Sequence, residues 1–227
     1  MLPIRDENHE ITTFPFITYG LITLNVLAFI YELTLSDNGL NRFLMEYGAV
    51  PAKIMVGNDL HALFSSMFLH AGWGHIIGNM LFLKVFGDNV EDQMGHWWFL
   101  AFYLITGLAA SGAHILLNQG STVPSVGASG AISGVLGAYI VSFPKNRVMV
   151  WVFFSLIAVP AWLMIGFWAA EQFLATVGTV ARTEQTTGGI AYAAHAGGFI
   201  AGVVLGLIAK GVSGRSNASR STSKRYY

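Results

Sequence analysis

The chain has 227 residues, of which 54% are hydrophobic and 11% charged, with a formal net charge of zero and a mean hydropathy of +0.56. Soluble domains carry about 25% charged residues, so the composition excludes an ordinary soluble domain and indicates an integral membrane protein. The sequence contains no cysteine, which also excludes disulfides and thiolate chemistry.

Three apolar stretches in the first half of the chain predict membrane spans, since a helix needs about 20 apolar residues to cross the hydrocarbon. They cover roughly residues 15–35, 68–87 and 97–117. Between the first two, Pro51 and Asp59 interrupt short amphipathic pieces within residues 36–60. We therefore expect a long first loop there.

The second half of the chain predicts three further spans, which makes six. The fourth begins near Ser129 and ends before Pro144, the fifth covers roughly 161–178 and the sixth roughly 188–209. Residues 148–178 are too long for one straight span, and Pro160 lies in their middle. Because proline interrupts a helix, we expect 148–159 to form a partly inserted or re-entrant piece.

The predicted fold is an all-α membrane protein, a bundle of six transmembrane helices over residues 14–209 with a long outer first loop. Residues 1–13 form a short N-terminal segment, where acidic residues accompany Arg5 and no cleaved signal peptide is expected. Residues 210–227 form a basic, serine-rich tail whose composition predicts disorder.

Six spans place both termini on one side of the membrane, and the positive charges indicate which side. Nine of the 12 Lys and Arg residues lie on the side of the termini: Arg5, Lys84, Lys145, Arg147, Lys210, Arg215, Arg220, Lys224 and Arg225. The other three are Arg42, Lys53 and Arg182. Because Lys and Arg concentrate in cytoplasmic loops, we predict cytoplasmic termini. The N-terminus does not resemble a transit peptide, so we expect the membrane to be the inner membrane of a prokaryote.

Small residues recur along the fourth and sixth predicted spans. The fourth contains Gly130, Gly134, Gly137 and Ala138, and the sixth contains Gly189, Ala193, Gly197 and Ala201 in one row and Gly198, Gly202 and Gly206 in another. Such rows let two backbones approach closely in lipid, so we expect these helices to touch along their length. That contact would bring Ser129 toward His195.

Ser129 stands in the tetrapeptide Gly-Ala-Ser-Gly, and His195 lies in a second apolar stretch. A serine hydroxyl needs an adjacent base to act as a nucleophile, and a neutral imidazole can be that base. Each residue also has a structural explanation, namely helix packing for the serine and a backbone hydrogen bond or a metal for the histidine. The sixth span offers no second metal ligand, and no carboxylate is placed to complete a triad, so we expect a dyad without metal or cofactor.

His75 and Asn79 are four residues apart in the second span, so they share one helix face. Both can donate hydrogen bonds, and two donors on one face can hold the oxyanion of a tetrahedral intermediate. Polar contacts between helices are the alternative explanation. His70 lies five residues before His75 and need not share that face, so it could anchor or cap the start of the helix.

The ordered segments HAGWGHIIGN, GASGAISG and AHAGGFIAG resemble the rhomboid family of intramembrane serine proteases, over roughly residues 60–206. The resemblance implies that Ser129 is the nucleophile and His195 the general base. It also implies that His75 and Asn79, with the N–H of Ser129, stabilise the oxyanion. The implied partners are single-span membrane proteins cleaved within the lipid bilayer; we expect no nucleic-acid partner, and the oligomeric state stays open.

Two positions depart from the family pattern. Many members carry Trp-Arg in the first outer loop, where this chain has His61-Ala62, so anchoring of the loop by that arginine is missing. Some members place an aromatic residue four positions after the serine, where it stacks on the histidine. This chain has Ser133 there, so packing or a hydrogen bond from Ser133 would hold His195 instead.

Two other functions fit parts of the pattern. One is a non-catalytic membrane-protein binder of the same architecture, but such relatives typically lack the serine or the histidine, and this chain keeps both. The other is a small transporter with His75, Asn79 and His195 along a substrate or proton path. No inverted repeat is visible in the sequence to support it.

Overall fold

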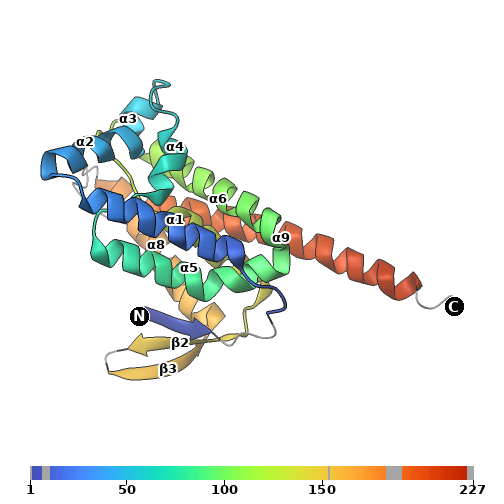
Figure 1. Ribbon diagram of the computed structural model, residues 1–227. Coiled ribbons are helices and arrows are strands. Elements are labelled where there is room, and N and C mark those ends of the chain that lie inside the picture. Colours follow the sequence, from blue (N-terminus) through green and yellow to red (C-terminus); the bar gives the residue numbers. More distant parts are fainter. Residues whose placement is uncertain (1, 7–10, 153, 183–190, 224–227) are drawn as a thin grey trace.

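The computed structural model describes residues 2–6, 11–152, 154–182 and 191–223, with side chains except at 179–182 and 212–223. It is a helical bundle with a small sheet on one side (Figure 1). In chain order the elements are β1 (Leu2–Asp6), α1 (Phe16–Leu33), α2 (Asp37–Tyr47), α3 (Pro51–Ile54), α4 (Ala62–Ser65), the 3₁₀ helix η1 (Ser66–Phe68), α5 (Trp73–Met94), α6 (His96–Leu117), α7 (Ser129–Ser142), β2 (Arg147–Val152), β3 (Ser155–Pro160), α8 (Ala161–Arg182) and α9 (Tyr192–Ser223).

A helix stands at each of the six positions where the sequence predicts a membrane span. Three segments of the described helices are long and apolar enough to cross a membrane: Phe16–Leu33, His96–Leu117 and Tyr192–Gly211. Helix α7 is apolar but has only 14 residues, and α5 carries Lys84 and Asp88 in its second half. The helical bundle is confirmed, and crossings by α5, α7 and α8 stay predictions.

Strands β2 and β3 form a β-hairpin, so the fold is mostly helical rather than all-α, and the predicted insertion of 148–159 into the membrane stays a prediction. Strand β2 pairs antiparallel with β3, with Val150 opposite Ile157, and β1 pairs antiparallel with the other edge of β2. The β-branched and aromatic residues of RVMVWV favour a strand, and Pro160 ends β3, where a proline is tolerated.

The sheet is tied to the bundle through Asp6 at the end of β1. Its carboxylate Oδ2 accepts hydrogen bonds from Asn89 Nδ2 of α5 at 2.8 Å and from the Tyr139 hydroxyl of α7 at 2.5 Å. Asp6 is buried, and a buried carboxylate is tolerated when its oxygens are hydrogen-bonded. The predicted N-terminal segment therefore contributes an edge strand that is hydrogen-bonded to two helices.

Carboxylates at the end of α5 bind the start of α1 and the segment before it. Glu91 is fully buried, and its Oε2 accepts from the backbone N–H and the hydroxyl of Thr18, both at 2.7 Å. Asp92 Oδ1 accepts from the backbone N–H groups of Thr12 and Thr13 at 3.1 and 2.9 Å. The first N–H groups of a helix have no partner within it, and anions there also complement the helix dipole.

The predicted long first loop contains α2 and α3. Side chains that follow α2 in the chain hold the loop by donating hydrogen bonds to backbone carbonyls at the end of α2. Lys53 Nζ donates to Met45 O at 3.0 Å, and the Ser65 hydroxyl donates to Tyr47 O at 2.7 Å. His61 Nε2 donates to Glu46 O at 3.0 Å. These groups satisfy carbonyls that a helix end leaves free. His61 thus anchors the loop at the position where the family pattern has Trp-Arg.

Helix α9 continues to Ser223, into the tail for which the composition predicts disorder. No proline in the sequence of this segment interrupts the helix. Figure 1 shows α9 leaving the bundle at the end where α1 and α6 begin. The helix therefore projects beyond the other elements at that end.

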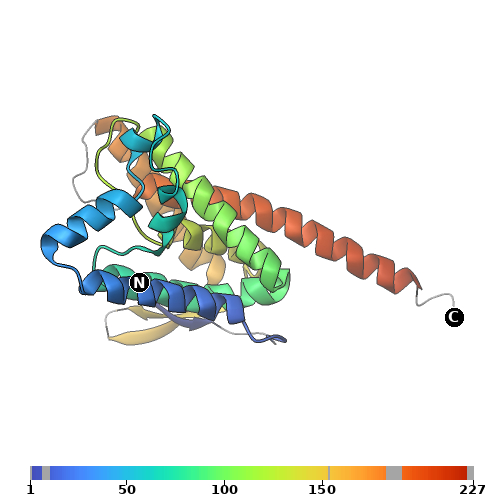
Figure 2. The ribbon, with the colours of Figure 1, turned by 45° about the horizontal axis from the view of Figure 1, so that its top comes forward.

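Helix α7 lies inside the bundle, and ten of its 14 residues are buried. Its closest neighbour is α9, where Gly198, Gly202 and Gly206 face Gly130, Gly134 and Ala138 in turn. A Cβ on Gly202 would overlap the carbonyl of Gly134, so the two backbones meet directly. The predicted contact between the fourth and sixth spans is confirmed. In Figure 2 the first part of α9 passes behind α6.

Candidate active site

Ser129 and His195 meet at the contact between α7 and α9. Ser129 is the first residue of α7, and His195 lies in the first turn of α9. The Ser129 Oγ lies 2.8 Å from His195 Nε2, and both residues are half-buried. Such a distance allows the hydroxyl to donate its hydrogen bond to the imidazole nitrogen.

The segment before Ser129 is fixed by backbone hydrogen bonds to two other parts of the chain. Ser125 exchanges both of its backbone hydrogen bonds with Ala49, at 2.9 Å each, and Gly127 N donates to Ser66 O at 2.8 Å. The first helical bond of α7 runs from Ile132 N to Ala128 O, so the N–H of Ser129 precedes it. That N–H belongs to the free group at a helix start, which is suited to an oxyanion.

Gly127 has a φ of +126°, a backbone conformation that side chains rarely adopt. A Cβ at this position would lie 2.6 Å from His75 Nε2 and 3.6 Å from Asn79 Nδ2. His75 therefore lies directly over the glycine two residues before Ser129. The absence of a side chain at residue 127 lets α5 place its polar groups beside the start of α7.

The structure thus brings His75 and Asn79 to the segment that precedes Ser129. Asn79 is buried, and its Nδ2 lies 2.9 Å from His70 Nε2. The rings of His70 and His75 are 5.1 Å apart, with an angle of 65° between their planes. His70 also donates its backbone N–H to the buried carboxylate of Glu32, at 3.2 Å from Oε1. His70 therefore connects Asn79 to α1, an anchoring role that fits its predicted one.

Gln172 of α8 is the residue that sequence reasoning missed. Its Oε1 lies 2.7 Å from His195 Nδ1, the nitrogen on the opposite side of the ring from Ser129. The expected dyad of Ser129 and His195 thus has a hydrogen-bonded amide beside it, a contact that was not predicted from the sequence. The only signal in the sequence is an amide among the apolar residues of AWLMIGFWAAEQFLA, since polar groups in membrane helices usually have a function.

Of the two expected ways to hold His195, the hydrogen bond from Ser133 is wrong, and packing against an aromatic ring is found. The Ser133 hydroxyl donates to Ser129 O at 2.6 Å, within the same helix, so it is not the group that holds His195. The aromatic neighbour of the imidazole comes instead from α8, where the Trp168 ring lies 6.0 Å from the His195 ring. A helical serine commonly bonds the carbonyl four residues earlier, which explains the difference.

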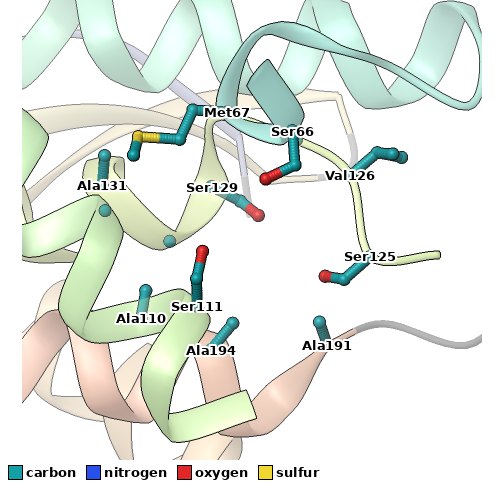
Figure 3. Close-up of a pocket in the computed structure, with 13 residues that line it drawn as sticks. Ser66, Met67, Ala110, Ser111, Ser125, Val126, Ser129, Ala131, Ala191 and Ala194 are labelled. Atoms are coloured by element: carbon teal, nitrogen blue, oxygen red, sulfur yellow. The ribbon is translucent and has the colours of Figure 1, made fainter. Parts of the chain in front are cut away.

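A small cavity of about 20 Å³ adjoins Ser129 (Figure 3). Hydroxyls of Ser66, Ser111, Ser125 and Ser129 line it, and its other walls come from small or flexible residues such as Ala110 and Met67. Such a space is sufficient for one water molecule with several polar partners. Water can therefore be held within reach of the Ser129 hydroxyl. Among the described residues, no group of three His, Asp or Glu side chains is arranged to hold a metal.

The sequence of this chain is similar to those of several known proteins. A family model, the Rhomboid domain, matches residues 57–211. Rhomboid protein 1, mitochondrial, of Saccharomyces cerevisiae is 32% identical over 197 residues, which cover 84% of this chain and 52% of that protein. RHOMBOID-like protein 5 of Arabidopsis thaliana is 29% identical over 165 residues, 73% of this chain and 49% of that protein. Rhomboid protease GluP of Bacillus subtilis is 35% identical over 136 residues, 60% of this chain and 26% of that protein. The chain thus spans about half the length, or less, of these relatives.

Proposed function

This chain belongs to the rhomboid family, and on that premise we propose that it is an intramembrane serine endopeptidase that cleaves transmembrane segments of membrane proteins. The observation that carries the proposal is the 2.8 Å distance between Ser129 Oγ and His195 Nε2. A non-catalytic binder does not require a serine hydroxyl hydrogen-bonded to an imidazole, whereas a serine protease does. The name of one relative, Rhomboid protease GluP, supports the same activity.

In the proposed reaction, the Ser129 hydroxyl attacks the carbonyl carbon of the scissile peptide bond while its proton passes to His195 Nε2. The resulting oxyanion is held by the N–H of Ser129 with His75 and Asn79, donors that act where negative charge develops. The protonated imidazole then gives its proton to the leaving amine, and an acyl-enzyme remains on Ser129. Water attacks this ester, and His195 again moves the proton.

The length of α7 supports a site that is recessed from the membrane surface. Its 14 residues span about 21 Å, less than the roughly 30 Å of the hydrocarbon core. If the end of α7 reaches the cytoplasmic boundary, Ser129 lies below the outer boundary. The serine-lined cavity next to it would then supply water where lipid cannot enter.

The substrate is proposed to be a transmembrane helix that unwinds near its outer end, because a peptide bond inside a helix is shielded. Glycine and proline weaken helices, so segments that contain them expose a peptide bond most readily. We place both termini on the cytoplasmic side of a prokaryotic plasma membrane. The distribution of nine against three positive residues supports that orientation.

The test is incubation of the purified protein in liposomes with a panel of tagged single-span membrane proteins, in parallel with Ser129→Ala. We expect the wild type to release a fragment cut within or beside the transmembrane segment of at least one substrate. Ser129→Ala should release none while its thermal unfolding in detergent stays unchanged. Equal cleavage by both proteins would refute the proposal.

A further inference from the structure

We propose that Gln172 is a positioning residue that fixes the tautomer of His195 and thereby makes its Nε2 able to accept the proton of Ser129. The proposal rests on the proposed function, since the orientation matters for a catalytic base. Its role is separate from those of Ser129, His75 and Asn79, because Gln172 contacts the base on the side away from the nucleophile.

Two contacts from α8 hold the imidazole of His195. Gln172 is 6% exposed, and its Oε1 lies 2.7 Å from Nδ1 at the edge of the ring. Trp168, one turn earlier on α8, places its indole 6.0 Å from the imidazole at an angle of 36°. Helix α8 therefore constrains both the edge and the face of the ring, and α7 contacts it at Nε2.

The hydrogen bonds require one particular tautomer. A neutral imidazole carries one proton, so one nitrogen donates and the other accepts. For Nε2 to accept from the Ser129 hydroxyl, the proton must be on Nδ1, which then needs an acceptor. The Gln172 carbonyl oxygen is that acceptor. If the amide were reversed, its NH₂ would face Nδ1, the proton would move to Nε2, and the base would be blocked.

The use of an amide rather than a carboxylate follows from the surroundings. Ionised groups are costly within a membrane, whereas a buried amide is tolerated when hydrogen-bonded. The titratable groups near His195 on the other described helices are His75 of α5 and His114 of α6. A neutral partner from α8 orients the ring without adding a charge. An amide stabilises the protonated imidazolium less than a carboxylate would.

The experiment compares Gln172→Leu, which removes the acceptor, with Gln172→Glu, which keeps it. Glu171→Leu on the exposed face of α8 is the matched control. For each protein, kcat and KM are measured against pH on a substrate from the panel. The tautomer of His195 is measured by ¹⁵N NMR on histidine-labelled protein, with the resonance assigned by its loss in His195→Ala. Thermal unfolding checks that each variant is folded.

We expect Gln172→Leu to lower kcat roughly 10-fold or more, the effect of one hydrogen bond, with little change in KM. Its ¹⁵N spectrum should lose the Nδ1–H tautomer that the wild type and Glu171→Leu show. Gln172→Glu should retain that tautomer and most activity. Its acid limb should move to higher pH, because a carboxylate stabilises the imidazolium and the neutral base is then lost at a higher pH.

An unchanged tautomer or an unchanged kcat in folded Gln172→Leu overturns the proposal, and so does a Gln172→Glu variant as inactive as Gln172→Leu. A failure of the proposed function would look different. The wild type would then cleave no substrate, or Ser129→Ala would cleave as well as the wild type. In either case the NMR measurement still decides whether Gln172 sets the tautomer.

Discussion

At the scale of single residues, the site depends on one position that must have no side chain. Gly127 has a φ of +126° and lies two residues before the nucleophile, and a Cβ there would lie only 2.6 Å from His75 Nε2. A methyl group there would strain the backbone and push His75 away from the segment that carries the N–H of Ser129. The geometry of the oxyanion donors therefore depends on Gly127 as much as on the donors themselves.

We predict that Gly127→Ala lowers the free energy of unfolding by roughly 1–3 kcal/mol, the cost of a strained backbone conformation. It should also lower kcat more than it raises KM, because the affected donors act on the transition state. Gly120→Ala is the control, since a Cβ at residue 120 meets nothing within 4 Å. Both quantities can be measured on the same detergent preparations. Wild-type values for Gly127→Ala would contradict the role of this glycine.

Sequence reasoning predicted Ser129, His195, His75 and Asn79 from short motifs, and the structure brings these four residues together. Gln172 lies in no motif and is 23 residues away from His195 on another helix, so only tertiary structure connects the two. The partner of Ser133 was missed for the opposite reason. Its hydrogen bond is local, to the carbonyl of Ser129, and competes with any contact to the imidazole.

At the scale of elements, the contact between α7 and α9 aligns the two halves of the candidate site. Gly198, Gly202 and Gly206 of α9 meet backbone atoms of α7, so a side chain larger than hydrogen at these positions separates the helices. Because Ser129 starts α7 and His195 lies near the start of α9, such a separation would lengthen their hydrogen bond. Packing and chemistry are thus coupled through this helix pair.

We predict that Gly202→Ala destabilises the protein by about 1–3 kcal/mol through overpacking and reduces cleavage, although residue 202 lies two turns from His195. The control is Gly211→Ala on the same helix, where a Cβ meets nothing within 4 Å and alanine is the better helix former. Thermal unfolding and cleavage of a panel substrate are the measurements. Equal behaviour of the two variants would show that the α7–α9 contact is less close than described.

The helices were predictable because long apolar segments with polar interruptions have few alternative structures in a membrane protein. The hairpin was not, since short apolar runs such as RVMVWV have no periodicity that separates strand from helix. Its third strand comes from Leu2–Asp6, more than 140 residues earlier in the chain. Pairing over such a distance leaves no local signal in the sequence.

At the scale of the whole molecule, the arrangement in the membrane depends on whether the short α7 crosses it. The chain contains no cysteine, so a single introduced cysteine is the only thiol in the protein that a maleimide can label. We predict that Gly120→Cys, before α7, reacts with a membrane-impermeant maleimide in intact cells. Lys145→Cys, after α7, should react only after permeabilisation. Both wild-type residues are exposed.

The same labelling pattern at both positions would contradict a crossing by α7, and with it the six-span arrangement. Labelling of Lys145→Cys alone in intact cells would instead support the crossing and reverse the orientation predicted from the positive charges. Cleavage activity of both cysteine variants serves as the control for folding. The outcome also bears on the depth of Ser129, because the recessed site follows from a helix of 14 residues that ends at the cytoplasmic boundary.

The central claim is that His195 activates Ser129 as a nucleophile, and a fluorophosphonate probe tests it without knowledge of the substrate. The protein in liposomes is treated with the probe, digested and mapped by mass spectrometry. We predict a single modified serine, Ser129, with labelling lost in Ser129→Ala and strongly reduced in His195→Ala. Absence of labelling in the folded wild type, or labelling that persists in Ser129→Ala, would contradict the account.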